Sequence, residues 1–192
     1  MPVSTSLSDL SELALVACDT SYFTNTNPVP LGSPLGPLDE GDPTIFPRFN
    51  FPADFFQTSQ FIDPPSVSTG FKAIAYEKTS VGNQKEVIIA FGGCDGGLLS
   101  NPTDWVSSTQ HLGWNQWDTN RAQIFDYLNR QPADTKITFT GQSLGGALAQ
   151  YAAYEWIKSK TEVDPTYDKS RMSLITFNAL GGYSGLVSNL GS

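Results

Sequence analysis

Histidine and cysteine are scarce in this chain. It has one histidine, His111, and two cysteines, Cys18 and Cys94. A structural zinc site needs about four such ligands, and no C-x-x-C pair is present, so we expect no metal site and no cofactor. The two cysteines allow at most one disulfide, and the sequence leaves open whether they are bonded.

The chain also has few basic residues and no long apolar runs. Lysine and arginine number 11 against 19 acidic residues, and the formal net charge is -8. Nucleic-acid binding relies on clustered basic side chains, so we expect no nucleic-acid partner. No stretch approaches the roughly 20 apolar residues of a membrane-spanning helix, and the N-terminus lacks the features of a signal peptide. Localisation stays open, because a C-terminal signal of a longer parent chain would also direct secretion.

What is present suits one folded domain over residues 1–192, since 39% of the residues are hydrophobic and 16% are charged. Residues 27–65 differ in composition, because they contain nine of the 13 prolines and six of the 12 phenylalanines. Proline disfavours regular structure, so this stretch is predicted to be a long loop within the domain. Its rings either pin the loop to the core or line an apolar acyl-binding mouth.

From residue 71 onward, short apolar runs alternate with amphipathic stretches. Such alternation predicts an α/β fold with a mostly parallel sheet flanked by helices. The expected strands are residues 71–76, 86–91, 136–140 and 173–177, and the expected helices are residues 7–20, 118–129 and 143–159.

A G-x-S-x-G motif spans Gly141, Ser143 and Gly145, at the junction of an expected strand and an expected helix. In a nucleophile elbow the serine occupies a strained turn, and side chains two residues to either side would collide, so glycine is needed there. The following helix directs free backbone N–H groups toward a developing oxyanion. The motif therefore predicts Ser143 as a nucleophile and the N–H of Leu144 as an oxyanion donor.

The run T-G-Q-S-L-G-G-A-L-A-Q at residues 140–150 resembles the nucleophile region of the class 3 (fungal-type) lipases. Residues 87–94, V-I-I-A-F-G-G-C, with Asp104 and Trp105 after them, resemble the family's V-V-V-A-F-R-G-T strand and later D-W segment. Residues 174–179 resemble the strand that follows the nucleophile helix. The resemblance implies an α/β-hydrolase that cleaves carboxylic esters of lipids through an acyl-enzyme on Ser143.

The chain departs from the family pattern in the oxyanion strand. Gly92 stands at the position of the family's Arg, and Cys94 at that of its Thr or Ser. The resemblance implies that the backbone N–H of Cys94 is the second oxyanion donor, with a thiol in place of the hydroxyl. The alternative is a small buried loop residue with no such role.

The partners that a serine nucleophile needs are missing. A base and an orienting carboxylate should follow the serine in the chain, yet no histidine follows Ser143. His111 is interpreted as a solvated loop residue, and Asp164 and Asp168 as surface carboxylates. We therefore expect the domain to be incomplete at its C-terminus, with the acid and base beyond residue 192, and the chain to be inactive by itself.

The acid and base could instead come from another chain, or the protein could be a hydrolase-like binding domain that lacks turnover. The sequence does not show whether the acyl group is transferred to water or to another acceptor. The expected partners are a lipid or other ester substrate, transient contact with a lipid surface, and association through an exposed sheet edge after residue 177.

Overall fold

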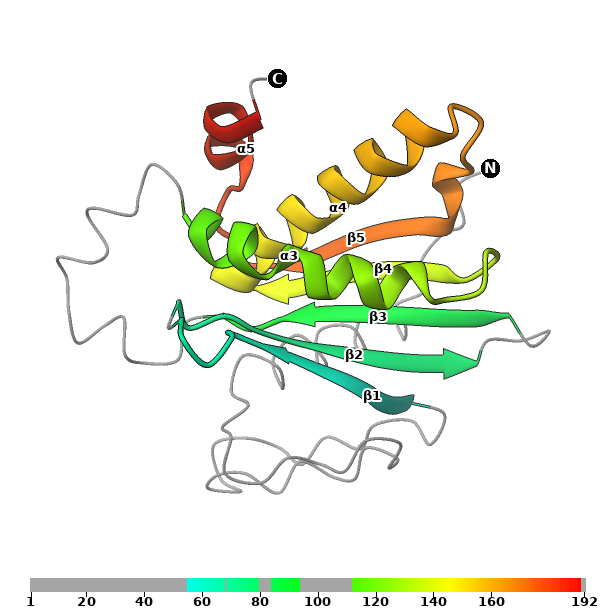
Figure 1. The fold of residues 1–192 in the computed structure, drawn as a ribbon, viewed down its shortest axis with the longest axis horizontal. Helices are drawn as coiled ribbons and strands as arrows, with labels where there is room; N and C mark the ends of the chain where they lie inside the picture. The colour runs from blue at the N-terminus through cyan, green and yellow to red at the C-terminus, as the bar shows by residue number, and fades with distance from the viewer. Residues whose placement is uncertain (1–54, 68, 80–83, 94–111, 191–192) are drawn as a thin grey trace, which may run out of the picture.

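The computed structural model describes residues 55–67, 69–79, 84–93 and 112–190. They form five strands and three α-helices, with a short 3-10 helix ahead of the last strand (Figure 1). No helix among these residues is long and apolar enough to cross a membrane. In chain order the elements are β1 (Phe55–Ile62), β2 (Lys72–Thr79), β3 (Lys85–Phe91), α3 (Trp114–Asn129), β4 (Lys136–Gln142), α4 (Leu144–Val163), η2 (Lys169–Arg171), β5 (Met172–Phe177) and α5 (Tyr183–Leu190).

The five strands form one sheet in the order β1-β2-β3-β4-β5. β1, β2 and β3 are antiparallel neighbours, whereas β3, β4 and β5 run parallel. Phe91 pairs with Gly141 and Gln142 pairs with Phe177, so the carboxyl ends of the three parallel strands lie at one edge. The expected α/β fold is confirmed, as a mixed sheet in which the parallel part carries the G-x-S-x-G turn.

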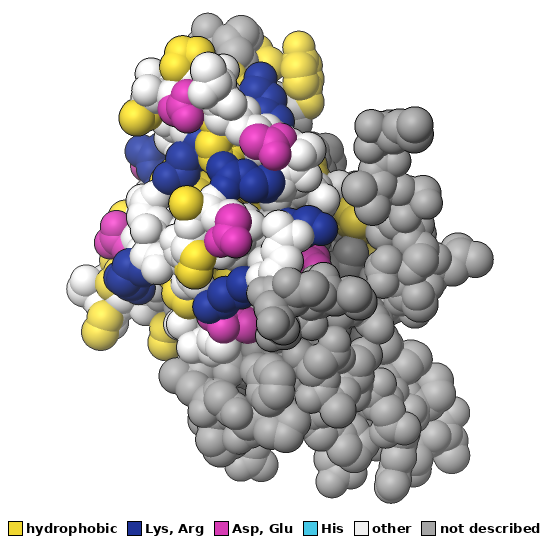
Figure 2. Space-filling model, turned by 90° about the vertical axis from the view of Figure 1, so that its right-hand side faces the viewer, with side chains coloured by type: hydrophobic (Ala, Val, Ile, Leu, Met, Phe, Trp, Pro, Cys, Tyr) yellow, Lys and Arg dark blue, Asp and Glu magenta, His cyan; other side chains and the backbone are white. Residues whose placement is uncertain are grey.

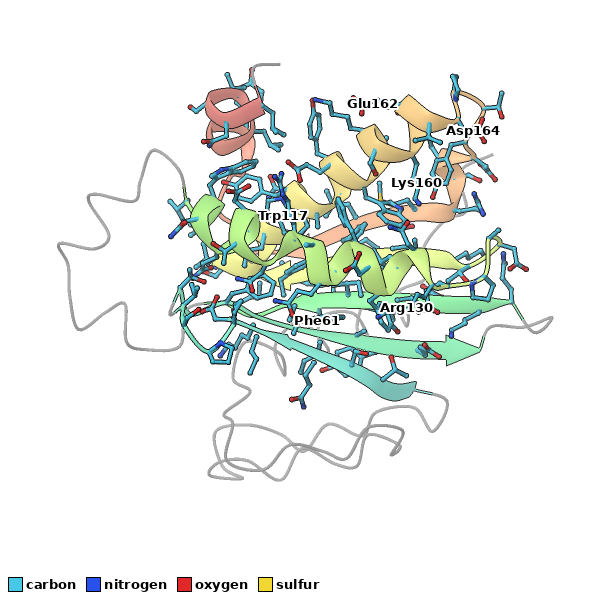
Figure 3. All side chains as sticks on the ribbon, in the orientation of Figure 1. Phe61, Trp117, Arg130, Lys160, Glu162 and Asp164 are labelled. Carbon is cyan, nitrogen blue, oxygen red and sulfur yellow. The ribbon has the colours of Figure 1, made fainter. Side chains whose placement is uncertain are left out.

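α3 and α4 lie on the same face of the sheet (Figure 1). Alternate residues of the central strands point at them, and the core includes Val87, Ile89, Phe91, Ile137 and Phe139, all of which are buried. An edge-to-face pair joins the sheet to the helices, with the ring centroids of Phe91 and Trp117 6.1 Å apart (Trp117 is labelled in Figure 3). A second pair joins the two helices, with the centroids of Phe125 and Trp156 5.4 Å apart. Burying rings of this size contributes much of the stability of such a core.

The prediction of irregular structure over residues 27–65 is wrong for Phe55–Ile62, which forms β1 and pairs with β2. The prolines nearest to this segment are Pro52 and Pro64, so the segment itself has none and keeps every backbone donor for the ladder. The rest of the expected loop, and the expected helix over residues 7–20, lie outside the described residues. α3 also begins earlier than expected, at Trp114, after Gly113 with a φ of 73°.

Candidate functional site

Ser143 is the residue between the end of β4 and the first residue of α4. Its φ is 56° and its ψ is -121°, a backbone conformation that glycine tolerates and a residue with a side chain adopts only under constraint. The residue is partly exposed, and its hydroxyl has no hydrogen-bond partner among the described residues. The turn therefore presents a strained serine at the carboxyl edge of the parallel strands.

Gly141 and Gly145 let the chain close on itself around this turn. A Cβ at Gly141 would collide with the backbone of Gly145, and a Cβ at Gly145 would collide with the carbonyl of Phe91. Neither collision could be relieved by rotating a side chain, because the atoms met are backbone atoms. The start of α4 therefore lies directly against the end of β3, at a distance that only glycine permits.

Backbone hydrogen bonds hold Ser143 in place from both sides. Its N–H donates to the carbonyl of Phe177 at 3.2 Å, and its carbonyl accepts from the N–H groups of Gly146 at 3.1 Å and Leu180 at 3.0 Å. Two of these partners belong to β5 and the segment after it. A strained conformation persists only where its surroundings over-determine it, and these three bonds supply that constraint.

Leu144 begins α4 and its side chain is buried, with an exposed fraction of 5%. The N–H of the first residue of a helix has no partner within the helix, so the Leu144 N–H is suited to an acceptor placed at the serine. Cys94 lies outside the described residues. The described segment 84–93 reaches the elbow, because the backbone of Phe91 lies against Gly145. The oxyanion roles of Leu144 and Cys94 stay predictions.

Asp63 organises the same end of the sheet, and the sequence alone did not single it out. Its carboxylate accepts from the N–H of Thr69 at 2.6 Å, the N–H of Phe71 at 3.2 Å and the buried amide of Asn120 at 2.8 Å. Burial by itself raises the pKa of Asp63, but the hydrogen bonds from Thr69, Asn120 and Phe71 outweigh it and lower that pKa. Asp63 thus fixes the turn into β2 against α3. An aspartate before Pro64-Pro65 was the available signal, because Asp commonly starts turns.

Tyr151 ties α4 to the segment in front of α3. Its hydroxyl donates to the carbonyl of Leu112 at 2.7 Å, and burial raises its pKa to about 12. The side chain therefore stays a neutral donor over the physiological range. Its ring packs edge-on to Trp114 with centroids 5.3 Å apart.

The other acidic candidates lie elsewhere. Asp164 and Asp168 follow the far end of α4, and a helix of 20 residues is roughly 30 Å long (Figure 3). Asp164 accepts from the N–H and hydroxyl of Thr166, and Asp168 from those of Ser170, and these bonds lower the pKa of both carboxyls. They are turn-forming surface groups. His111 lies outside the described residues, and within the described part of the chain no cluster of His, Cys, Asp or Glu suits a metal ion.

Comparison with known proteins identifies the family and the fold. A family model described as "Phospholipase-like: Tle-like phospholipase domain" matches residues 52–161, more than half of the chain. No curated protein sequence matches significantly.

Solved structures with a similar fold include fungal lipases. The lipase–propeptide complex of Rhizomucor miehei superposes with a TM-score of 0.54 at 16% identity, over 91% of this chain and 53% of that chain. A mutant form of MDLA from Penicillium cyclopium gives 0.52 at 21% identity, over 90% of this chain and 62% of that chain. The chain thus spans about half to three fifths of the length of these proteins, and at these identities the likeness establishes the fold.

Proposed function

The chain belongs to the Tle-like phospholipase domain family, and from that premise we propose that it acts as a serine hydrolase on carboxylic esters of lipids, with Ser143 as nucleophile. The observation that carries this proposal is the backbone of Ser143, held at a φ of 56° between a parallel strand and a helix N-terminus. A serine held in a strained backbone conformation between a strand and a helix is expected at a catalytic turn.

The proposed reaction proceeds in two steps. The Ser143 Oγ attacks the ester carbonyl carbon while a base takes its proton, and the ester C–O bond breaks as the alcohol oxygen receives that proton. Water then attacks the acyl-enzyme in the same way and releases the carboxylic acid and the free serine. The N–H groups of Leu144 and Cys94 are the proposed donors to the oxyanion, a kind of contact worth about 10²–10³ in rate.

We assign no base or acid among these 192 residues, because the single histidine, His111, precedes Ser143. A lipid ester is the proposed substrate, and transient contact with a lipid surface follows from it. Association through the edge of β5, whose Leu174 is 40% exposed, is a further proposed contact.

A fluorophosphonate probe tests the nucleophile, with imidazole in solution as a substitute base. We expect mass spectrometry to find phosphonylation at Ser143, accelerated by imidazole, because the turn and its helix N-terminus retain part of the catalytic machinery without the base. Ser143→Ala should abolish this labelling, whereas Ser159→Ala, which removes a hydroxyl in the same helix bonded to the Trp156 carbonyl, should not.

Labelling of Ser143 no faster than that of other serines would overturn the proposal and favour the second candidate, a hydrolase-like binding domain without turnover. Fast labelling that needs no imidazole and disappears in His111→Ala would instead assign the base to His111. Product analysis with a competing alcohol would then separate hydrolysis from acyl transfer.

A further inference from the structure

The side-chain amide of Gln150, in the second turn of α4, bridges that helix to the segment after β5. Its Nε2 donates to the carbonyl of Leu180 at 3.2 Å and to that of Gly146, also at 3.2 Å. Its Oε1 accepts from the N–H of Gly182 at 3.0 Å. One partly buried side chain thus makes three hydrogen bonds, two of them to a segment about 30 residues away in the sequence.

The segment that Gln150 holds is the one that holds Ser143. The N–H of Leu180 donates to the Ser143 carbonyl at 3.0 Å, and the same residue's carbonyl receives the Gln150 amide. Gly146, whose carbonyl Gln150 also contacts, donates its own N–H to the Ser143 carbonyl at 3.1 Å. Both donors to the strained residue's carbonyl are therefore joined to Gln150.

The residues of this segment give it little intrinsic rigidity. It leaves β5 through Asn178, whose φ is 44°, and continues through Gly181, which is exposed and has no atoms near its Cβ position. Gly146 packs so closely against Ala179 that a Cβ would collide with the alanine side chain. A turn with two glycines and a left-handed residue has much conformational freedom to lose, so it needs a specific anchor.

Glutamine is suited to this place because its planar amide offers a donor and an acceptor on one group. The donor meets two carbonyls and the acceptor meets the N–H of Gly182. A glutamate would keep the acceptor and lose the donor, and a methionine of similar size would lose both. The position thus requires an amide rather than a polar or a long side chain in general.

We propose that Gln150 is a positioning residue that fixes the backbone of Ser143, and with it the direction of the nucleophilic hydroxyl, through residues 180–182. This role rests on the proposed function, since it concerns the nucleophile of that reaction. Gln150 does not contact the reacting atoms. It acts by keeping the Leu180 N–H on the Ser143 carbonyl while the ester is attacked.

The test compares Gln150→Met with Gln131→Met in the full 192-residue chain. Gln131 is the matched control, since its amide donates to the Tyr127 carbonyl at 3.2 Å beyond the far end of α3. Two quantities are measured: the rate of fluorophosphonate labelling at Ser143 with imidazole present, and hydrogen exchange at the Leu180 amide. Gln150→Glu serves as a second variant that keeps the acceptor for Gly182 if the methionine variant fails to fold.

We expect Gln150→Met to speed exchange at Leu180 about tenfold and to slow labelling about tenfold or more per folded molecule, because small displacements of a nucleophile are costly in rate. Gln131→Met should change neither, even where it lowers the free energy of unfolding equally. Unchanged exchange, or unchanged labelling despite faster exchange, would overturn the positioning role. If the wild type itself is not labelled, the proposed function has failed, and exchange at Leu180 still decides whether Gln150 holds the elbow.

Discussion

The two ends of α4 are held by different kinds of interaction. At its first turn the helix meets the sheet through backbone: Gly145 lies against the Phe91 carbonyl, and residues 144–149 are all buried. Backbone hydrogen bonds from Gly146 and Leu180 fix the residue in front of it. Small side chains allow this approach, and none of these contacts depends on charge.

The second half of α4, from Glu155 to its far end, is held by long side chains. Glu155 is buried and accepts from the Trp117 indole at 3.1 Å and from the Arg121 guanidinium at 3.0 Å. Lys160 donates to Asn129 at 2.6 Å and lies 4.2 Å from the centre of the Trp156 ring. Basic and acidic side chains are interspersed over this face of the molecule (Figure 2).

This contrast indicates which end of α4 must be held in an exact position. Long side chains can follow a small shift of the helix by changing rotamer. Contacts between backbone atoms do not adjust in this way, so they hold the strained Ser143 to one geometry. The helix is rigidly docked where the proposed chemistry takes place and more adaptably docked at the opposite end.

The largest effect is expected where a side chain is added between α4 and β3. Gly145→Ala would place a Cβ against the Phe91 backbone, so α4 must move away from the sheet. We expect a loss of about 3 kcal/mol or more in the free energy of unfolding, together with loss of Ser143 labelling. Chemical denaturation measures the first and the fluorophosphonate probe the second.

The matched control is Gly181→Ala, at an exposed glycine with no atoms within 4 Å of its Cβ position. The free energy of unfolding should stay within about 0.5 kcal/mol of the wild type. Equal losses in the two alanine variants would show that the contact between α4 and β3 is not the constraint.

A smaller effect is expected in the second half of α4. Glu155→Ala leaves the buried Trp117 indole without an acceptor, whereas Arg121, whose side chain is 40% exposed, can still pair with Asp118 at 3.1 Å. We expect a loss of about 2 kcal/mol in the free energy of unfolding, and Glu155→Gln should lose less because its amide oxygen still accepts. Labelling of Ser143 per folded molecule should not change in either variant, and a decrease would mean that the two ends of the helix are coupled.

Features that depend on neighbouring residues could be predicted from the sequence, whereas features that depend on distant residues could not. The elbow and the central strands were predictable because their signals are local: the glycines of G-x-S-x-G and the unbroken apolar run of residues 87–91. β1 was missed because proline content was averaged over residues 27–65, which hid the proline-free stretch of Phe55–Ile62. A narrower window would have found it.

The contacts that support the candidate site were not predictable in the same way. Gln150 and Leu180 are 30 residues apart and meet only because β5 pairs beside β4. Asp63 and Asn120 meet across 57 residues for a similar reason. No residue pattern indicates such a pair before the topology is known. The roles of Ser143, Leu144 and Cys94 remain predictions that the probe experiments test.

The smallest expected effect is on the free energy of unfolding, and it reports the backbone strain at Ser143 apart from its reactivity. Ser143→Gly removes the side chain that makes a φ of 56° unfavourable, whereas Ser143→Ala keeps a Cβ and hence the strain. Glycine also gains freedom in the unfolded chain, which offsets part of the relief, so we expect the glycine variant to be more stable than the alanine variant by about 1 kcal/mol. Both variants lose the nucleophile, so a difference in their free energies of unfolding reports the backbone alone. If the alanine variant is equally stable, the elbow holds no measurable strain, and the case for Ser143 as nucleophile would then rest on the G-x-S-x-G turn and on the probe.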